Sequence, residues 1–176
     1  MTAMIEPEPE PADNAQPTLH IDVQNVLASE SDLSAVPSTD DFKGWANTAY
    51  GVVASLLDLP CENEFTLRIV EEAEISQLNG DFRGKTKPTN VLSFPFEVPT
   101  GLDIALLGDV VICHQVVVSE AEEQSKTVRQ HYAHMLTHGI LHLCGYDHEE
   151  EAEAEKMEAL EVQILALSAF PNPYLI

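Results

Sequence analysis

The chain has 176 residues, of which 44% are hydrophobic, and this is enough for a domain with a buried core. No run of about 18 apolar residues occurs, so the sequence predicts no membrane-spanning helix. The formal net charge of −22 argues against strong non-specific binding to nucleic acid, because an acidic surface repels a polyanion.

The N-terminal segment, residues 1–16, is acidic and rich in proline. We expect it to be disordered, because it offers little apolar surface to offset the entropy cost of ordering. It lacks the basic start and apolar centre of a secretory signal, and the three cysteines form no CxxC pair. These features predict a cytoplasmic protein with reduced thiols, in which residues 17–176 form a single domain.

The middle of the chain alternates between strand and helix patterns. Apolar and polar residues alternate in two predicted strands, around residues 18–26 and 65–69. Between them, apolar residues recur at helical spacing in a segment that begins after the capping residues 38–40 and ends before Pro60. The patterns that follow predict a short helix at 72–78, a loop at 79–90, and strands at 91–96 and 108–113, the last of them central in its sheet.

The last third of the chain is predicted to be helical, with helices at about 114–125, 128–143 and 149–168. Thr127 and Gln130 have the spacing of a capping box for the second of these helices. The acidic run after Asp147 is interpreted as a solvated face of the third. Together these elements predict an α+β fold, in which a small four-stranded mixed sheet packs with about five helices.

Three histidines lie close together in the segment HGILHLCGYDH, which runs from His138 to His148. His138 and His142 are four residues apart in a predicted helix, so both side chains lie on one face and can reach the same ion. Gly145 can end this helix in a left-handed conformation, and the turn brings His148 round as a third ligand. Three histidines around Zn²⁺ leave one coordination position open, and a water in it has a pKa of ~7. The pattern predicts one catalytic-type zinc site per chain, at the end of a central helix.

A histidine pair at this spacing is, by itself, more often an ordinary helix surface than a metal site. The third histidine and the absence of charged residues from 139 to 146 favour metal binding. The same spacing occurs in the metzincin proteases, which carry a glutamate general base directly after the first histidine. That position is Gly139 here, so a peptidase ranks second among the metal-dependent hydrolases that residues 17–176 could form.

Three further segments accompany the histidine block: LNGDFRGKTKPTNVLSFPFE, LLGDVVICHQVVVSEA and EAEKMEALEVQIL. In their order and spacing, the four segments resemble the YbeY endoribonucleases, a family of bacterial rRNA maturation factors. The resemblance covers roughly residues 40–174. One departure is Asn90, where the family usually has aspartate. An amide cannot act as a carboxylate, so we assign this position no role.

The resemblance implies a compact α+β fold with zinc held by the three histidines, and it maps the family's arginine onto Arg83. It also implies action on single-stranded RNA, in processing of small-subunit rRNA (the 3′ end of 16S rRNA) and in ribosome quality control. The partners implied are the small ribosomal subunit and an assembly GTPase, with no membrane and no DNA as targets.

The loop predicted at residues 79–90 contains Arg83, Lys85 and Lys87. A guanidinium can hold a phosphate by two parallel hydrogen bonds and stabilise extra charge on phosphorus, so a catalytic role is assigned to Arg83. A catalytic role is also assigned to His138, one of the three candidate metal ligands. The alternative for Arg83 is an ordinary solvated loop residue. Lys85 and Lys87 are interpreted as positive charges that attract the substrate.

Several neighbours of the histidine block receive weaker interpretations. His134 lies one turn before His138, and could be a general base, a substrate contact or a support for a ligand, although a hydrogen-bonded interior histidine is the more ordinary interpretation. Asp147 could orient a ligand histidine, cap the following helix, or do both. Residues 93–95 are expected to form one wall of the cleft. His114 and His131 are assigned no function.

Three functions compete on this basis: a zinc-dependent, single-strand-specific endoribonuclease, a metzincin-like hydrolase of another substrate, and a non-catalytic ribosome-assembly factor with structural zinc. The basic cluster and Gly139 favour the first. Its product is a 5′-phosphate if zinc-bound hydroxide attacks phosphorus, or a 2′,3′-cyclic phosphate if the RNA 2′-hydroxyl attacks. The net charge suggests docking onto a basic ribosomal protein.

Overall fold

The computed structural model describes residues 15–175, in which the chain forms four strands and six helices. Disorder is predicted for residues 1–16, and most of this segment lies outside the described range. Residues 15 and 16 are described and have no regular secondary structure. The elements are β1 (Thr18–Asn25), α1 (Glu30–Ala35), α2 (Thr39–Leu57), β2 (Glu62–Val70), α3 (Glu72–Arg83), β3 (Val91–Pro95), β4 (Gly108–Cys113), α4 (His114–Glu123), α5 (Val128–Leu143) and α6 (Glu151–Leu167). None of the helices in the described range is long and apolar enough to cross a membrane.

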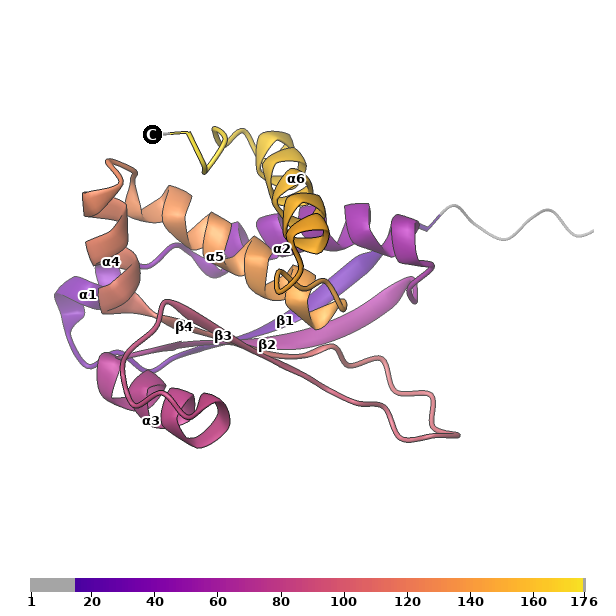
Figure 1. Cartoon of the computed structure of the whole chain (residues 1–176), viewed down its shortest axis with the longest axis horizontal. Coiled ribbons are helices and arrows are strands. Elements are labelled where there is room, and N and C mark those ends of the chain that lie inside the picture. Colours follow the sequence, from indigo (N-terminus) through magenta and orange to yellow (C-terminus); the bar gives the residue numbers. More distant parts are fainter. Residues whose placement is uncertain (1–14, 176) are drawn as a thin grey trace, which may run out of the picture.

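The four strands form one mixed sheet in the order β1-β2-β4-β3. β1, β2 and β4 run parallel, and β3 runs antiparallel to β4. Figure 1 shows α2 and α5 on one face of the sheet, α6 stacked over α5, and α3 on the opposite face. The predicted α+β class, the four-stranded mixed sheet and the interior position of 108–113 are confirmed.

Capping residues set where α2 and α5 begin, as the sequence predicts. Ser38 caps α2 in a capping box with Asp41, and Thr127 caps α5 in a capping box with Gln130. α5 has buried residues around most of its circumference, because it lies between the sheet, α2 and α6. It is therefore the central helix of the domain, and the position of its C-terminal end decides where the histidines lie.

The structure corrects several predicted boundaries. α3 does not end at residue 78 but continues to Arg83, so Arg83 ends a helix and is not in a loop. Gly80 suggests a loop in the sequence, yet it is helical, and its missing side chain makes room for Thr86 (a β-carbon there would lie 3.1 Å from the Thr86 methyl carbon). The buried Asn79 side chain donates a 2.8 Å hydrogen bond to the Lys87 carbonyl, which folds the following loop back onto the helix.

The other differences are small. The six-residue helix α1 was not predicted, since it buries none of its residues and therefore has no apolar periodicity. The predicted strand at 91–96 ends one residue earlier, and the helices predicted at 114–125 and 149–168 are shorter by two and three residues, respectively. Differences of this size at helix ends are normal, because terminal turns depend on local capping.

Candidate metal centre

Three histidines converge at the C-terminal end of α5. His138 and His142 lie one turn apart on the helix, and His148 follows in the next loop. One ring nitrogen from each lies within 4.8 Å of the others, and the Nε2 atoms of His138 and His142 are 3.1 Å apart. Two ligands of a tetrahedral zinc ion are about 3.3 Å apart, given Zn–N bonds of 2.0–2.1 Å. The three nitrogen donors therefore suit a single ion of this kind.

A glycine turn brings His148 back to the helix. Gly145 has a φ of 99°, which is accessible to glycine at little cost, and the Tyr146 amide donates a 3.0 Å hydrogen bond to the Leu141 carbonyl. Asp147 then accepts a 2.7 Å hydrogen bond from the main-chain amide of His148. Asp147 thus stabilises the backbone at a candidate ligand, through the amide of His148 and not through an imidazole ring.

His142 is held in the form that binds metal. Burial lowers the pKa of its imidazole, and the neighbouring His138 and His148 lower it further. A neutral imidazole has a free lone pair, whereas a protonated one does not. The group is therefore poised to bind a cation at neutral pH.

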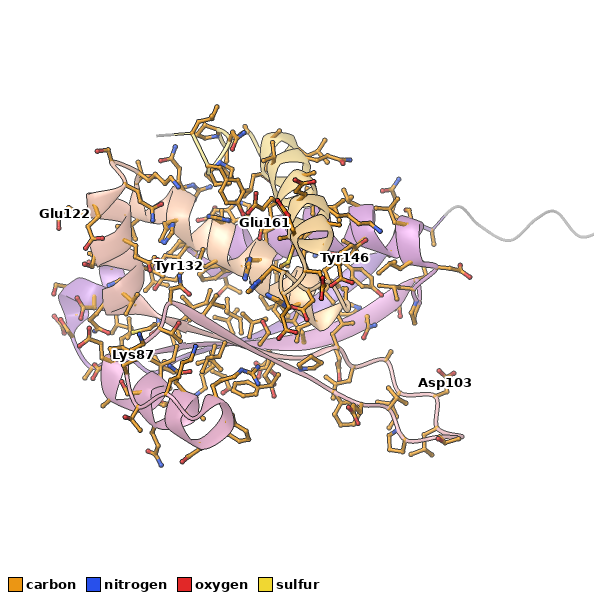
Figure 2. All side chains as sticks on the ribbon, viewed as in Figure 1. Lys87, Asp103, Glu122, Tyr132, Tyr146 and Glu161 are labelled. Carbon is orange, nitrogen blue, oxygen red and sulfur yellow. The ribbon has the colours of Figure 1, made fainter. Side chains whose placement is uncertain are left out.

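Glu161 is the residue of this site that the sequence interpretation missed. It belongs to the acidic run interpreted as a solvated face, but its exposed fraction is 0% (Figure 2 shows it between α5 and α6). Its Oε1 lies 2.6 Å from Nδ1 of His138, and its Oε2 lies 3.3 Å from Nε2 of His134. Burial raises the pKa of this carboxyl, but the two histidines lower it by more, to about 2. The missed signal is its place in the apolar stripe of α6: Met157, Leu160, Ile164 and Leu165.

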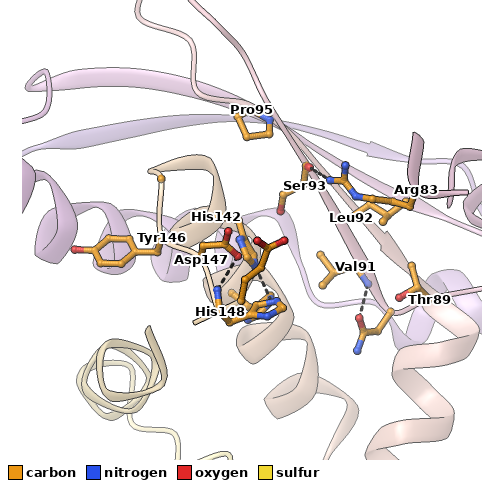
Figure 3. A pocket seen from close by; sticks show the side chains of 14 residues that line it. Arg83, Thr89, Val91, Leu92, Ser93, Pro95, His142, Tyr146, Asp147 and His148 are labelled. Carbon is orange, nitrogen blue, oxygen red and sulfur yellow. Dashed lines mark hydrogen bonds between the residues drawn. The ribbon is translucent and has the colours of Figure 1, made fainter. Parts of the chain in front are cut away.

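A cavity of about 660 Å³ opens beside the three histidines. Arg83, Ser93 and Pro95 line it together with the histidines, although they come from α3 and β3. Figure 3 shows Arg83 and Ser93 across the cavity from His142 and His148. The Arg83 guanidinium donates a 3.2 Å hydrogen bond to the Ser93 carbonyl and lies 5.9 Å from the centre of the Phe94 ring. Arg83 is therefore steered toward the cavity while it remains exposed.

The two neighbouring lysines are placed differently from Arg83. Lys85 and Lys87 are exposed residues of the loop after α3 and are not among the residues that line the cavity. Of the basic cluster, only Arg83 is brought to the histidines. Any effect of Lys85 or Lys87 on a ligand in the cavity would be electrostatic and would act over a longer distance.

Asn90 also lines the cavity, and it has a definite structural contact. Its Nδ2 donates to both carboxylate oxygens of Glu120, at 3.2 and 3.1 Å, while its Oδ1 accepts from the Val91 amide. Glu120 in turn lies 2.6 Å from Nε2 of the buried His131. The amide at position 90 thus joins the cavity wall to the half-buried Glu120 and, through it, to the buried His131.

The remaining histidines of the helical region are interior residues. His134 and His131 are buried on α5, and His114 is buried and lies 2.7 Å from the Tyr132 hydroxyl. Burial lowers the pKa of both His114 and His131. None of the three lines the cavity with the candidate ligands, and His134 reaches the site only through Glu161.

Known proteins resemble this chain in sequence and in fold. A family described as "Endoribonuclease YbeY" matches residues 27–168. A curated relative, "Endoribonuclease YbeY" from Alteromonas mediterranea, is 50% identical over 158 residues, which cover 89% of this chain and 97% of the relative. The solution structure of TM1509 from Thermotoga maritima is similar in fold, with a TM-score of 0.54 at 24% identity, over 86% of this chain and 92% of that one.

Proposed function

The chain belongs to the endoribonuclease YbeY family, and we propose that it is a zinc-dependent endoribonuclease that cuts single-stranded RNA. We propose further that it acts in maturation of the 3′ end of 16S rRNA and in ribosome quality control. The observation that carries the proposal is the presence of Arg83 and the three histidines on one cavity. A guanidinium and three candidate metal ligands on one cavity support binding of a phosphate beside a metal ion.

The three histidines would hold the ion through one nitrogen each, and their spacing and the lowered pKa of His142 fit zinc. When bound, zinc would act as a Lewis acid on a phosphate oxygen or acidify a water molecule. The three histidines line the cavity wall, so an ion that they held would be accessible from the space that a substrate enters. No fourth protein ligand accompanies the three histidines in the group that the described residues form, which suits a catalytic site better than a closed structural one.

Arg83 would bind the phosphate at the cleavage position. Its guanidinium carries a fixed charge and can donate two parallel hydrogen bonds to phosphate oxygens. The Ser93 carbonyl and the Phe94 ring hold the side chain over the cavity, so little reorganisation is needed when a substrate enters. As negative charge builds up around phosphorus, this contact strengthens, and such a donor contributes about 10²–10³-fold to a reaction rate.

The charge of the chain bears on how it would reach its substrate. A net charge of −22 weakens non-specific attraction to RNA, so specificity would come from the cavity and from protein partners. We propose the small ribosomal subunit, through a basic ribosomal protein, and an assembly GTPase as partners in the cytoplasm. Neither membranes nor DNA are proposed as targets.

The test is an RNA cleavage assay on purified protein whose zinc content is measured in the same sample. Wild type is compared with Arg83→Ala, His142→Ala and, as the matched control, Lys87→Ala, which removes a nearby cation that does not line the cavity. We expect wild type to cut single-stranded but not double-stranded RNA, Arg83→Ala to lose about 10²–10³-fold, His142→Ala to be inactive, and Lys87→Ala to lose only a few-fold. Equal cleavage by all four proteins would identify a contaminating nuclease and contradict the proposal.

The same assay separates the two cleavage chemistries. RNA ends that carry a 5′-phosphate indicate attack by water, and a 2′,3′-cyclic phosphate indicates attack by the RNA 2′-hydroxyl. A substrate with 2′-deoxyribose at the cleaved position is cut only in the first case. The carboxylates that line the cavity are Asp147 and Glu149, and we propose them as candidate proton acceptors in either route.

A further inference from the structure

Glu161 joins three parts of the chain at one buried point. One carboxylate oxygen is 2.6 Å from Nδ1 of His138. The other is 3.3 Å from Nε2 of His134 and also accepts a hydrogen bond from the hydroxyl of Tyr174, in the segment after α6. The carboxylate therefore contacts α5 at two successive turns and the C-terminal segment at a third position, and both of its oxygens are engaged.

The contact with His138 has a chemical consequence for the ring. An ionised carboxylate only accepts hydrogen bonds, so a neutral His138 donates its proton from Nδ1. The lone pair of His138 then lies on Nε2, which is the atom that faces Nε2 of His142 at 3.1 Å. The direction of the Glu161 contact thus matches the nitrogen that the metal centre needs.

Burial makes this arrangement stiff. Glu161 is fully buried, and a buried carboxylate that loses its partners is costly, so its position is held by the hydrogen bonds around it. Tyr174 and His134 fix the second oxygen and stop the carboxylate from rotating away from His138. Without this contact the His138 ring could adopt either tautomer and rotate about its bond to the helix.

We propose that Glu161 is a positioning residue of the metal centre, which holds His138 with Nε2 toward the ion, and that Tyr174 holds Glu161 in place. This inference depends on the proposed function, because it concerns the same three histidines. Carboxylates that orient ligand histidines in this way typically raise metal affinity 10–100-fold. A role limited to joining α6 to α5 would instead change the stability of the metal-free protein and leave its affinity for metal unaltered.

The first experiment measures zinc affinity by competition with a chromophoric chelator. Wild type is compared with Glu161→Gln, Tyr174→Phe and the control Glu155→Gln, which makes the same chemical change at an exposed position of α6. We expect the dissociation constant for zinc to rise about 10–100-fold in Glu161→Gln, to rise by less in Tyr174→Phe, and to stay within two-fold of wild type in Glu155→Gln. If folded Glu161→Gln binds zinc as tightly as wild type, the proposal is wrong.

A second measurement tests the same contact without metal and without activity. The tautomer of His138 is determined by ¹⁵N NMR in metal-free wild type and in Tyr174→Phe, which preserves the carboxylate if Glu161→Gln fails to fold. The proposal expects a proton on Nδ1 of His138 in wild type and a mixture of tautomers in Tyr174→Phe. A proton on Nε2 in wild type would overturn it. Failure of wild type to bind zinc would instead contradict the proposed function, while the tautomer still reports on Glu161.

Discussion

Gly139 lies so close to Val110 that a β-carbon at position 139 would stand 2.7 Å from a methyl carbon of that valine. Val110 is fully buried in the interior strand β4, and the Ser93 hydroxyl of β3 donates a 3.1 Å hydrogen bond to the Gly139 carbonyl. Position 139 directly follows the first candidate ligand. The glutamate that metzincin peptidases carry there has no room in this packing, which adds a steric reason to prefer a nuclease.

The contact of Gly139 with Val110 predicts the effect of a single added methyl group. Gly139→Ala should destabilise the protein by about 1–3 kcal/mol, because overpacking against β4 outweighs the better helix propensity of alanine. The control is Gly51→Ala in α2, where a β-carbon meets nothing within 4 Å, and this variant should gain up to about 1 kcal/mol. Urea unfolding measures both. Equal stability of Gly139→Ala and Gly51→Ala would contradict the close packing of α5 on the sheet.

Removal of the metal should leave the domain folded. The core includes fully buried residues from the sheet, α2, α5 and α6, and none of its buried members comes from residues 144–150, the loop that carries His148. Zinc at 100 times its dissociation constant should add about 2.7 kcal/mol to the free energy of unfolding, since it binds only the folded chain. Thermal unfolding with and without a chelator checks this. The melting temperature of His142→Ala should be the same under both conditions, because this variant has lost a metal ligand. Loss of helical circular dichroism on chelation would identify the zinc as structural.

The metal-free protein should lose stability as the pH falls below ~6.5, the ordinary pKa of histidine. Burial lowers the pKa of His114, His131 and His142 in the folded chain. Between the folded and unfolded pKa values, the unfolded state binds protons that the folded state does not, so unfolding is favoured by up to about 1.4 kcal/mol per pH unit for each histidine. Glu161, whose folded pKa is about 2, contributes its loss only below ~4.5 and therefore does not affect this range.

Urea unfolding at pH 7.5 and pH 5.5, with chelator and at fixed ionic strength, measures this dependence. His131→Gln removes one of the three groups and should show a smaller difference between the two pH values than wild type. An unfolding free energy that is the same at both pH values would contradict the buried, neutral state of these histidines.

Asn90→Asp should destabilise the protein, although the related family usually has aspartate at this position. The change replaces two hydrogen bonds to Glu120 with a second carboxylate at about the same distance, which should cost about 1–3 kcal/mol at pH 8. The penalty should shrink at pH 5, where one of the two carboxyl groups can take up a proton. Asn90→Ala, which loses the hydrogen bonds without adding charge, is the control. If Asn90→Asp is as stable as wild type at pH 8, the contact between Asn90 and Glu120 does not form as described.

Much of the candidate site could be predicted because its geometry is local in the sequence. Two histidines four residues apart share a helix face whatever the rest of the chain does, and Gly145 turns the next loop back. The capping box of Thr127 and Gln130 likewise depends only on neighbours along the chain. For the same reason, apolar periodicity predicts the four strands and the long helices, together with the α+β class.

The tertiary structure decided which distant residues join that local motif. Glu161 is 23 residues from His138, and Ser93 is 46 from Gly139, so neither contact leaves a periodic signal. Arg83 lines the same cavity as the histidines because α3 continues to residue 83 and β3 lies beside α5. A buried carboxylate and a solvated one are the same letter in a sequence. Whether Glu161 loses its water depends on how α6 packs on α5, and that packing is set by the whole core.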